Sequence, residues 1–238
     1  MFLERKALKN ARRIVACSNR TASEVVSLGF PENIVSAIHN GADPKDFSVD
    51  PAKSRAELGF ADNGVIAFFA GDIRSNRKNL DTVLRALVKT PDIYLVVAGN
   101  SDGSPYPELA NELGIADQVE FLGFRADIHD IMSVSDFFVF PSRYEPFGMV
   151  AVEAAFCGVP TILSRAVGAN EAIGDGAIAI EDSEDVEALA NAMRQLASDP
   201  SLRESMRQKS LKTRDTCSWE HITDRWMSLL NEILERKN

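Results

Sequence analysis

From residue 65 to residue 180, short apolar runs alternate with segments of helical periodicity, and this alternation constrains the fold more than any other feature. Apolar runs of this kind, separated by helices, are typical of a parallel sheet that is covered on both faces. We therefore predict an α/β fold with a doubly wound, Rossmann-like parallel sheet, whose ligands bind outside the carboxyl ends of the strands. The predicted strands are residues 65–69, 93–97, 119–122, 137–140, 161–163 and 177–180, and helices are predicted at 80–89, 108–113 and 127–134.

The stretch from Pro141 to Ala154 is predicted to be a turn followed by the start of a buried helix. Pro146 disfavours helix at the residue before it, so the chain turns there. The apolar run after Gly148 fits a strand or a helix by periodicity alone, but its length, its alanines and the stop at residues 158–160 favour a helix. A helix start offers free N–H groups and a positive dipole end, so we expect a bound anion there, and specifically a phosphate.

Two acidic residues, Glu145 and Glu153, frame this turn and helix. Glu153 interrupts an otherwise apolar helix, and a buried carboxylate needs hydrogen-bond partners, which the hydroxyls of a sugar can supply. The alternative is that Glu153 is a solvated residue on the single polar edge of a core helix.

A second candidate site is the loop after the first strand of the sheet, where Arg74, Arg77 and Lys78 fall within five residues. Asn79 is predicted to cap the following helix, which would bring these cations close to its positive end. Cations gathered there repel one another unless an anion joins them, so the loop predicts a phosphate site. The alternative is a solvated basic loop.

The two ends of the chain are predicted to be mostly helical. The last helix begins near Ser218 and carries an apolar stripe from Trp219 to Ile233, which either covers the first residues of the chain or drives self-association. The other predicted elements are helices at 1–12, 21–28, 54–58, 186–196 and 201–212, strands at 14–17 and 34–38, and a turn at 39–43; the second of these helices opens on a capping-box spacing from Thr21 to Glu24.

Composition excludes several classes of protein. The net charge of −9, from 26 basic and 35 acidic residues, argues against a nonspecific nucleic-acid binder, which needs a basic face. The three cysteines and three histidines are scattered, so we expect no metal site, and reduced thiols in a cytoplasmic protein. No apolar run is long enough to span a bilayer, and the first residues do not read as a secretory signal.

The motif Glu145-x7-Glu153, with Pro141-Ser142 before it and Gly158-Val159-Pro160 after it, resembles the signature of retaining glycosyltransferases of the GT-B fold, and of glycosyltransferase family 4 above all. Further landmarks occur in the family's order, including Cys17-Ser18 and Asn40-Gly41-Ala42-Asp43. The resemblance implies that residues 1–38 are the end of a first domain, residues 39–216 the C-terminal donor-binding domain, and residues 217–238 a crossover helix that packs back toward the N-terminal segment.

The resemblance also implies a function. The chain would bind a nucleoside-diphosphate sugar as donor substrate, without a metal or other cofactor, for hexosyl transfer to a saccharide or glycolipid acceptor, with peripheral membrane association where the acceptor is a lipid. Two alternatives stay open: a nucleotide-sugar-binding module without activity of its own, and a GT-B epimerase or phosphorylase.

Carried over to this sequence, the resemblance implies roles for individual residues. Lys78 matches the family's lysine, but Asp72 stands where the family usually has arginine, so Arg77 or Arg74 would supply the second charge on the diphosphate. Glu145, Lys78 and Arg77 are the expected catalytic residues. The expected substrate-binding residues are Arg74, Gly71, Gly99, Gly123, Ser142, Phe147, Gly148, Met149, Val150 and Glu153, with Glu145 on a sugar hydroxyl, Glu153 on the ribose and the two loops at Gly99 and Gly123 near the base.

Overall fold

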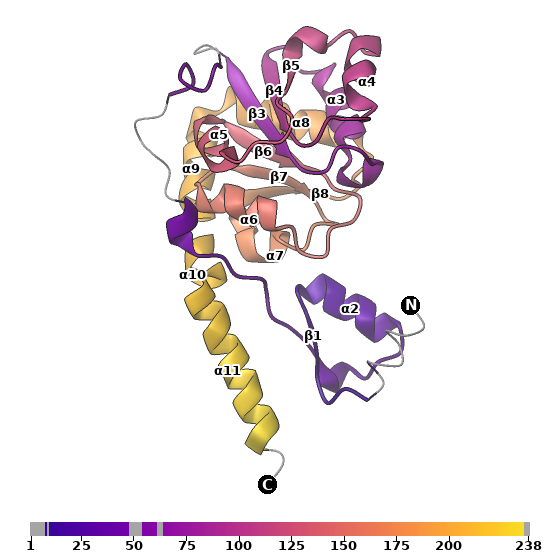
Figure 1. The fold of residues 1–238 in the computed structure, drawn as a ribbon, viewed down its shortest axis with the longest axis vertical. Helices are drawn as coiled ribbons and strands as arrows, with labels where there is room; N and C mark the ends of the chain where they lie inside the picture. Colours follow the sequence, from indigo (N-terminus) through magenta and orange to yellow (C-terminus); the bar gives the residue numbers. More distant parts are fainter. Residues whose placement is uncertain (1–7, 9, 48–53, 61–63, 236–238) are drawn as a thin grey trace.

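The computed structural model describes residues 8, 10–47, 54–60 and 64–235 (Figure 1). The six predicted strands form one sheet in the order β5-β4-β3-β6-β7-β8, and every neighbouring pair in it is parallel. The α/β fold with a parallel sheet is therefore confirmed. The strands are β3 (Val65–Ala70), β4 (Ile93–Ala98), β5 (Val119–Phe121), β6 (Phe137–Phe140), β7 (Thr161–Ser164) and β8 (Ala177–Ile180).

The strand order reverses between β3 and β6, at the middle of the sheet. Right-handed crossovers that run outward in the two directions from this pair place their helices on opposite faces. Helix α3 (Leu80–Leu87) packs against α4 (Tyr106–Glu112), whereas α5 (Ile128–Val134) packs against α6 (Met149–Phe156). A ligand crevice is expected outside the carboxyl ends of β3 and β6, where the order reverses.

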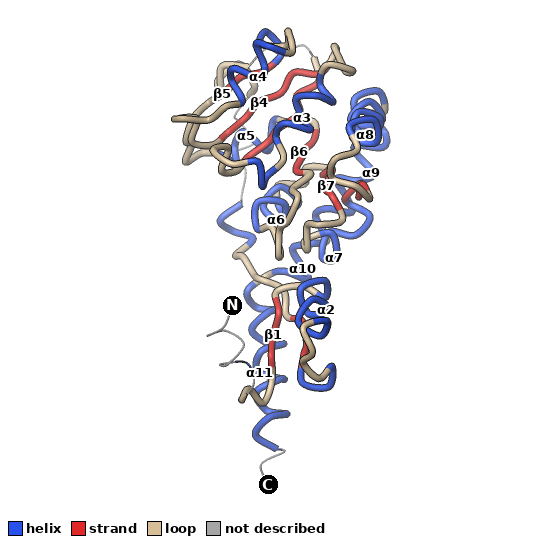
Figure 2. The backbone as a smooth tube through the Cα atoms, turned by 90° about the vertical axis from the view of Figure 1, so that its right-hand side faces the viewer, coloured by secondary structure: helices blue, strands red, loops and turns tan. Residues whose placement is uncertain are grey.

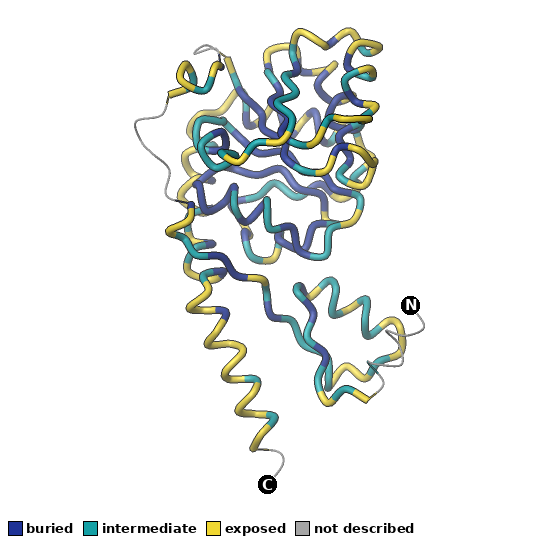
Figure 3. Tube along the Cα trace, in the orientation of Figure 1, coloured by how far each residue is buried: buried dark blue, intermediate teal, exposed yellow. Residues whose placement is uncertain are grey.

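Aromatic side chains fill the centre of the molecule. The Phe68 and Phe138 rings lie 5.9 Å apart, the Phe69 and Phe140 rings lie 6.0 Å apart, and all four side chains are fully buried. These residues occupy neighbouring central strands that have helices on both faces, which explains why their apolar runs show no alternation (Figure 3).

After β8, the residues that the structure describes form four helices. Two of them begin at aspartates whose side chains accept a hydrogen bond from the backbone of the first turn: Asp185 from Ala188 N and Asp199 from Leu202 N, both at 2.9 Å. Two short helices were not predicted: α7 (Asn170–Ile173), which lies between β7 and β8, and α10 (Thr213–Cys217), which follows α9. The remaining helices are α8 (Val186–Ser198), α9 (Pro200–Leu211) and α11 (Trp219–Glu235).

The first described residues build a small separate unit at the end of the main domain where α7 lies (Figures 1 and 2). Strands β1 (Ile14–Ala16) and β2 (Val35–Ala37) pair in parallel, and α2 (Asn19–Ser27) connects them. Helix α2 begins earlier than predicted because Ser18, not Thr21, is its N-cap and accepts a hydrogen bond from Thr21 N at 3.1 Å.

The helices predicted at 54–58 and at 1–12 have different outcomes. Residues 54–58 form turns instead of the predicted helical segment. The helix predicted at 1–12 falls mostly outside the described residues.

Helix α11 runs beside this small unit (Figure 2). Arg13 pairs with Glu232 at 2.6 Å, and Arg225 donates to the Ala37 carbonyl at 2.8 Å. One face of α11 stays exposed, with Trp219, Trp226, Met227, Leu230 and Leu234 on it. Among the described residues, no helix combines the length and the apolar character that crossing a bilayer requires.

Candidate functional site

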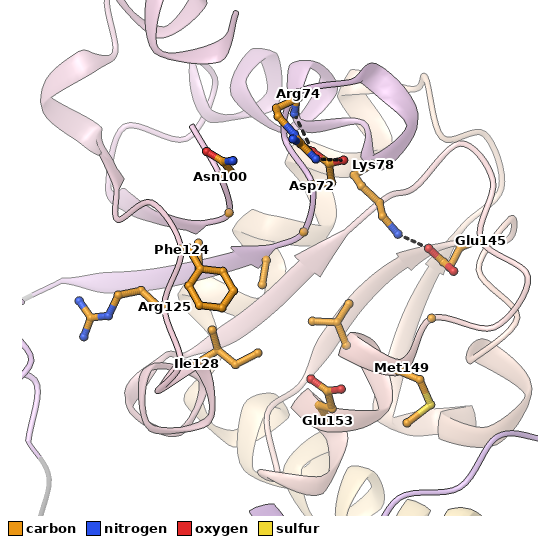
Figure 4. A pocket seen from close by; sticks show the side chains of 16 residues that line it. Asp72, Arg74, Lys78, Asn100, Phe124, Arg125, Ile128, Glu145, Met149 and Glu153 are labelled. Carbon is orange, nitrogen blue, oxygen red and sulfur yellow. Dashed lines mark hydrogen bonds and ion pairs between the residues drawn. The ribbon is translucent and has the colours of Figure 1, made fainter. Parts of the chain in front are cut away.

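A pocket of about 520 Å³ lies at the carboxyl ends of the central strands, at the predicted crevice (Figure 4). It brings together the two stretches that the sequence singled out, because Lys78 and Gly148 both line it. Nine of the predicted site residues are in its lining: Gly71, Arg74, Lys78, Gly99, Glu145, Gly148, Met149, Val150 and Glu153.

The start of helix α6 forms one wall of the pocket. Its N-cap, Gly148, has φ = 99°, and no side chain among the described residues caps the helix. Within the described part of the chain, no hydrogen bond occupies the N–H groups of Gly148, Met149 or Val150. A Cβ at residue 148 would lie 3.0 Å from Val167 and 3.1 Å from Glu145, so the left-handed backbone and the tight space both require glycine. The result is a set of free donors at the positive end of a helix dipole.

Lys78 faces these donors across the pocket. Its Nζ forms an ion pair with Glu145 Oε2 and lies 4.9 Å from the centre of the Phe140 ring. The Lys78 and Glu145 side chains are only 13% and 14% exposed. A largely buried ammonium that is held by one carboxylate can accept a second anion as a partner.

Arg74 also lines the pocket and is paired with Asp72. The Arg74 guanidinium donates to Asp72 through Nε at 2.9 Å and through Nη2 at 3.1 Å. Hydrogen bonds from the Arg74 side chain and backbone lower the pKa of Asp72 from its ordinary 3.8 to about 2. Asp72 and Arg74 therefore form a salt bridge at the edge of the pocket.

Arg77 is placed differently from what the sequence suggested. Its side chain is exposed and is not part of the pocket lining, although its carbonyl accepts hydrogen bonds from Arg143 N at 2.9 Å and Ser142 Oγ at 3.0 Å. Arg77 therefore joins the basic loop to the turn after β6 through its backbone. Ser142 has the same joining role and also lies outside the lining.

Asn79 occupies the N-cap position of α3 but does not cap it with its side chain. Its backbone is left-handed, with φ = 65°. The buried amide donates to the Pro141 carbonyl at 2.8 Å and to the Ser183 carbonyl at 2.6 Å, and its oxygen accepts from Thr82 at 2.6 Å. The residue thus fastens the end of the basic loop to two neighbouring loops.

Arg143 is a structural residue that sequence reasoning missed. It forms two hydrogen bonds with Asp81, at 2.8 and 2.9 Å, and it pairs with Glu184. Burial alone would raise the pKa of Asp81, but the hydrogen bonds and charge of Arg143 outweigh it and lower that pKa. This network holds the turn that carries Glu145 against the start of α3.

Glu153 lies inside the pocket and not on an outer edge of α6. Its carboxylate is 3.7 Å from His129 Nε2, and its side chain is 21% exposed. The helix therefore presents Glu153 to the cavity, where its oxygens can accept hydrogen bonds from a ligand (Figure 4).

The opposite wall of the pocket comes from the loops after β4 and β5. A Cβ at Gly99 would lie 2.1 Å from the Gly71 carbonyl, so the loop after β4 approaches the loop after β3 at a distance that only glycine permits. Gly123 accepts a hydrogen bond from Gly99 N at 2.9 Å but does not line the cavity itself. Sequence reasoning missed four lining residues of this wall: Asn100, Phe124, Arg125 and Ile128.

Phe147 and the three cysteines lie outside the lining of the pocket. Phe147 is buried behind the pocket, with its ring 5.3 Å from that of His39. The cysteines Cys17, Cys157 and Cys217 are unpaired, and burial raises the pKa of Cys157 to about 12 and of Cys217 to about 11. Nowhere in the described ranges do three or more His, Cys, Asp or Glu residues group as metal ligands would.

Comparison with known proteins identifies the family. The family model described as "Glycosyl transferases group 1" matches residues 50–213, which is more than half of the chain. The chain belongs to this family. The resemblance noted from the Glu145-x7-Glu153 motif is thereby confirmed.

Curated relatives of this group 1 chain include the D-inositol 3-phosphate glycosyltransferase of Mycolicibacterium gilvum, which is 32% identical over 233 residues. That match covers 93% of this chain and 52% of the relative. The chain thus spans about half the length of the curated relatives it matches.

Two solved structures support the fold. Sucrose-phosphate synthase from Thermosynechococcus elongatus has a TM-score of 0.86 at 24% identity. The match covers 99% of this chain and 61% of the synthase chain. HepE from Anabaena, solved in complex with UDP, has a TM-score of 0.84 at 25% identity. The match covers 93% of this chain and 64% of the HepE chain. The six-stranded sheet and the C-terminal helix therefore match the C-terminal half of the GT-B fold.

Proposed function

We propose that this chain is the donor-binding half of a retaining, metal-independent glycosyltransferase that uses a nucleoside-diphosphate sugar for hexosyl transfer. The observation that carries the proposal is the convergence of Lys78 and the free N–H groups at the start of α6 on one pocket. A diphosphate needs such a combination of cation and backbone donors. Another HepE structure contains UDP-glucose, which makes UDP-sugars the first donors to test.

In this proposal the diphosphate displaces the carboxylates that now hold the pocket's cations. Lys78 leaves Glu145 for a phosphate oxygen, and Arg74 supplies the second charge. Both cations and the helix start then stabilise the negative charge that develops on the leaving nucleoside diphosphate, which is usually the largest contribution to catalysis of this kind. Glu145, once released, accepts a hydrogen bond from a sugar hydroxyl.

We assign the ribose and the base of the donor to other residues of the pocket and its loops. Glu153 accepts hydrogen bonds from the ribose hydroxyls, and the loops that contain Gly99 and Gly123 lie near the base. Arg77, the third expected catalytic residue, is exposed and outside the lining, so the second charge on the diphosphate is assigned to Arg74.

We propose that residues 1–38 are the end of a first domain, that residues 39–216 are the donor domain, and that residues 217–238 are the crossover helix. A saccharide or glycolipid acceptor, peripheral membrane association and a cytoplasmic location are proposed with it. Self-association through the exposed face of α11 is a further proposal.

A second candidate function is donor binding without transfer by the chain itself. The observation that favours it is the chain's length, since it spans about half of its curated relatives. Assaying hydrolysis or transfer of UDP-glucose by the chain, beside binding, separates these two functions.

Isothermal titration with UDP, GDP and ADP tests the common part of both functions. We expect binding of at least one nucleotide, with release of heat, to one site per chain. If none of the three binds at millimolar concentration, donor binding is excluded and the proposal is wrong.

A further inference from the structure

The turn Glu145-Pro146-Phe147 is held from two sides. The Glu145 carbonyl accepts from Gly168 N at 3.1 Å, and the Phe147 carbonyl accepts from Ala169 N at 2.7 Å, so two of the turn's three carbonyls bind the neighbouring loop of the main domain. The carbonyl between them, that of Pro146, binds outside that domain. It accepts from Ser18 Oγ at 2.8 Å and from Thr21 Oγ1 at 3.3 Å.

These two donors belong to the first turn of α2, in the small unit built by β1, β2 and α2. Ser18 is fully buried. A Cβ added at Gly168, in the loop after β7, would lie 2.8 Å from the Cβ of Ser18. The start of α2 therefore packs directly against the turn that contains Glu145 and leads into α6.

One carboxylate of the main domain accepts several hydrogen bonds from the start of α2. Glu171, from α7 of the main domain, accepts from Asn19 N at 2.7 Å, Asn19 Nδ2 at 2.9 Å and Arg20 N at 2.9 Å. His39 Nε2 lies 3.3 Å from the same carboxylate, and the His39 ring packs on Phe147. An ionised carboxylate that receives several N–H groups at a helix start binds more strongly than a neutral cap does.

Further contacts tie the other side of α2 to the same turn. Tyr144 donates its hydroxyl hydrogen to Glu24 at 2.9 Å, and Arg20 donates to the Ala166 carbonyl at 2.9 Å. The Arg20 guanidinium also lies 5.1 Å from the centre of the Tyr144 ring. The small unit thus contacts the residues before, within and behind the turn.

We propose that Glu171 and Ser18 are positioning residues that latch the small unit onto the turn of the donor pocket, so that the placement of the unit and occupation of the pocket influence each other. The importance of the turn for a nucleotide rests on the proposed function. Coupling between two sites is reciprocal, so a ligand that tightens the turn must also tighten the start of α2.

Hydrogen exchange without any nucleotide tests the latch itself. In Glu171→Ala, amides 19 and 20 lose a direct partner, so the informative amides are those of Glu145 and Ala151, which donate to Ala166 and Gly148 and not to Glu171. We expect both to exchange about tenfold faster, the effect of losing a hydrogen bond to a charged group, while amides in β3 and β4 keep their rates. Glu181→Ala, which removes an exposed carboxylate paired with Arg165, is the matched control and should change neither amide. If only amides 19–21 accelerate in Glu171→Ala, Glu171 is a simple helix cap and the latch is refuted.

Exchange in the presence of UDP tests the reciprocal effect. Bound UDP should slow exchange at amides 19–21 about fivefold or more, although α2 does not line the pocket, and Ser18→Ala should abolish this protection. Unchanged exchange in α2 at saturating UDP contradicts the coupling. If UDP does not bind the unaltered chain, the proposed function fails, whereas the nucleotide-free experiment still decides the latch.

Discussion

At the residue scale, the charges of the pocket are neutralised in pairs. Lys78 is held by Glu145 and Arg74 by Asp72, so each cation that we assign to the diphosphate already has a carboxylate partner. Exposed pairs such as Arg74–Asp72 contribute little to stability, and a diphosphate offers more negative charge than either carboxylate. Donor binding is therefore an exchange of partners and not the filling of an empty cationic site.

The Asp72→Asn variant tests this exchange. It releases Arg74 from its carboxylate, so we expect UDP to bind about 2- to 5-fold more tightly, in line with the small strength of an exposed ion pair. Glu181→Gln, which releases Arg165 elsewhere on the surface, should leave UDP affinity unchanged in the same titration. Weaker UDP binding by Asp72→Asn would show instead that Asp72 orients Arg74 productively.

The pKa of Asp72 sets the pH range of this effect. Because the folded-state pKa is lowered to about 2, the carboxylate is ionised and paired above its ordinary pKa of 3.8, and the pair is lost only as the pH falls toward 2. The difference between Asp72→Asn and the unaltered chain should therefore be the same at about pH 6 and at about pH 8.

Local sequence predicted those pocket residues that lie within one motif. Glu145, Gly148 and Glu153 share a single turn and helix, and Lys78 stands in a conspicuous basic loop. Phe124 and Arg125 carry no such pattern, although their position just after Gly123 at a predicted strand end was an available signal. Arg143 could not be assigned, because its partners Asp81 and Glu184 are distant in sequence and meet it only in the folded chain.

At the element scale, the site depends on how α6 begins. The strand before it is buried on both faces, and the helix must start within the short turn between Pro141 and Met149. Gly148 makes this start possible by adopting a left-handed backbone, which leaves three N–H groups pointing to the pocket without a side-chain cap.

Gly148→Ala tests that geometry against a matched glycine. At Gly103, which also has positive φ, an added Cβ meets nothing within 4 Å, so Gly103→Ala measures backbone strain alone, about 1 kcal/mol. Gly148→Ala adds close contacts with Val167 and Glu145, and we expect it to lower the free energy of unfolding by about 2–3 kcal/mol and to weaken UDP binding. Urea unfolding and titration measure both quantities. Equal effects of the two variants would mean that the space around Gly148 is not restrictive.

Periodicity located the six sheet strands within one or two residues, since long apolar runs have little choice of structure. It failed where side chains from elsewhere decide the boundary. The N-cap of α2 depends on Ser18 contacting Pro146 and on Glu171, which are more than a hundred residues away in sequence from α2. The short helices α7 and α10 contain too few residues for a periodic pattern to appear.

At the scale of the whole molecule, the described residues that line the pocket all belong to the main α/β domain, and the described parts of the small N-terminal unit and of α11 lie outside this lining. This arrangement predicts that the chain binds donor by itself. It also predicts that binding stabilises the fold, because a ligand that binds only the folded state shifts the unfolding equilibrium.

A thermal-shift experiment measures this stabilisation. At a UDP concentration about 100 times Kd, the stabilisation is about 2.7 kcal/mol, which corresponds to a rise in Tm of about 5–10 °C for a chain of this size. Uridine at the same concentration is the control and should raise Tm less. An unchanged Tm at saturating UDP would be incompatible with a site in the folded domain.

The central claim is that Lys78 and the start of α6 grip one diphosphate, and the most direct test compares UDP with UMP on three proteins. In the unaltered chain, we expect UDP to bind about 10- to 100-fold more tightly than UMP, because charge-assisted bonds hold the second phosphate. Lys78→Ala should remove most of that preference, whereas Lys89→Ala, which removes a lysine paired with Glu187 far from the pocket, should retain it. If Lys78→Ala keeps the full preference for UDP over UMP, Lys78 does not bind the diphosphate and the account is contradicted.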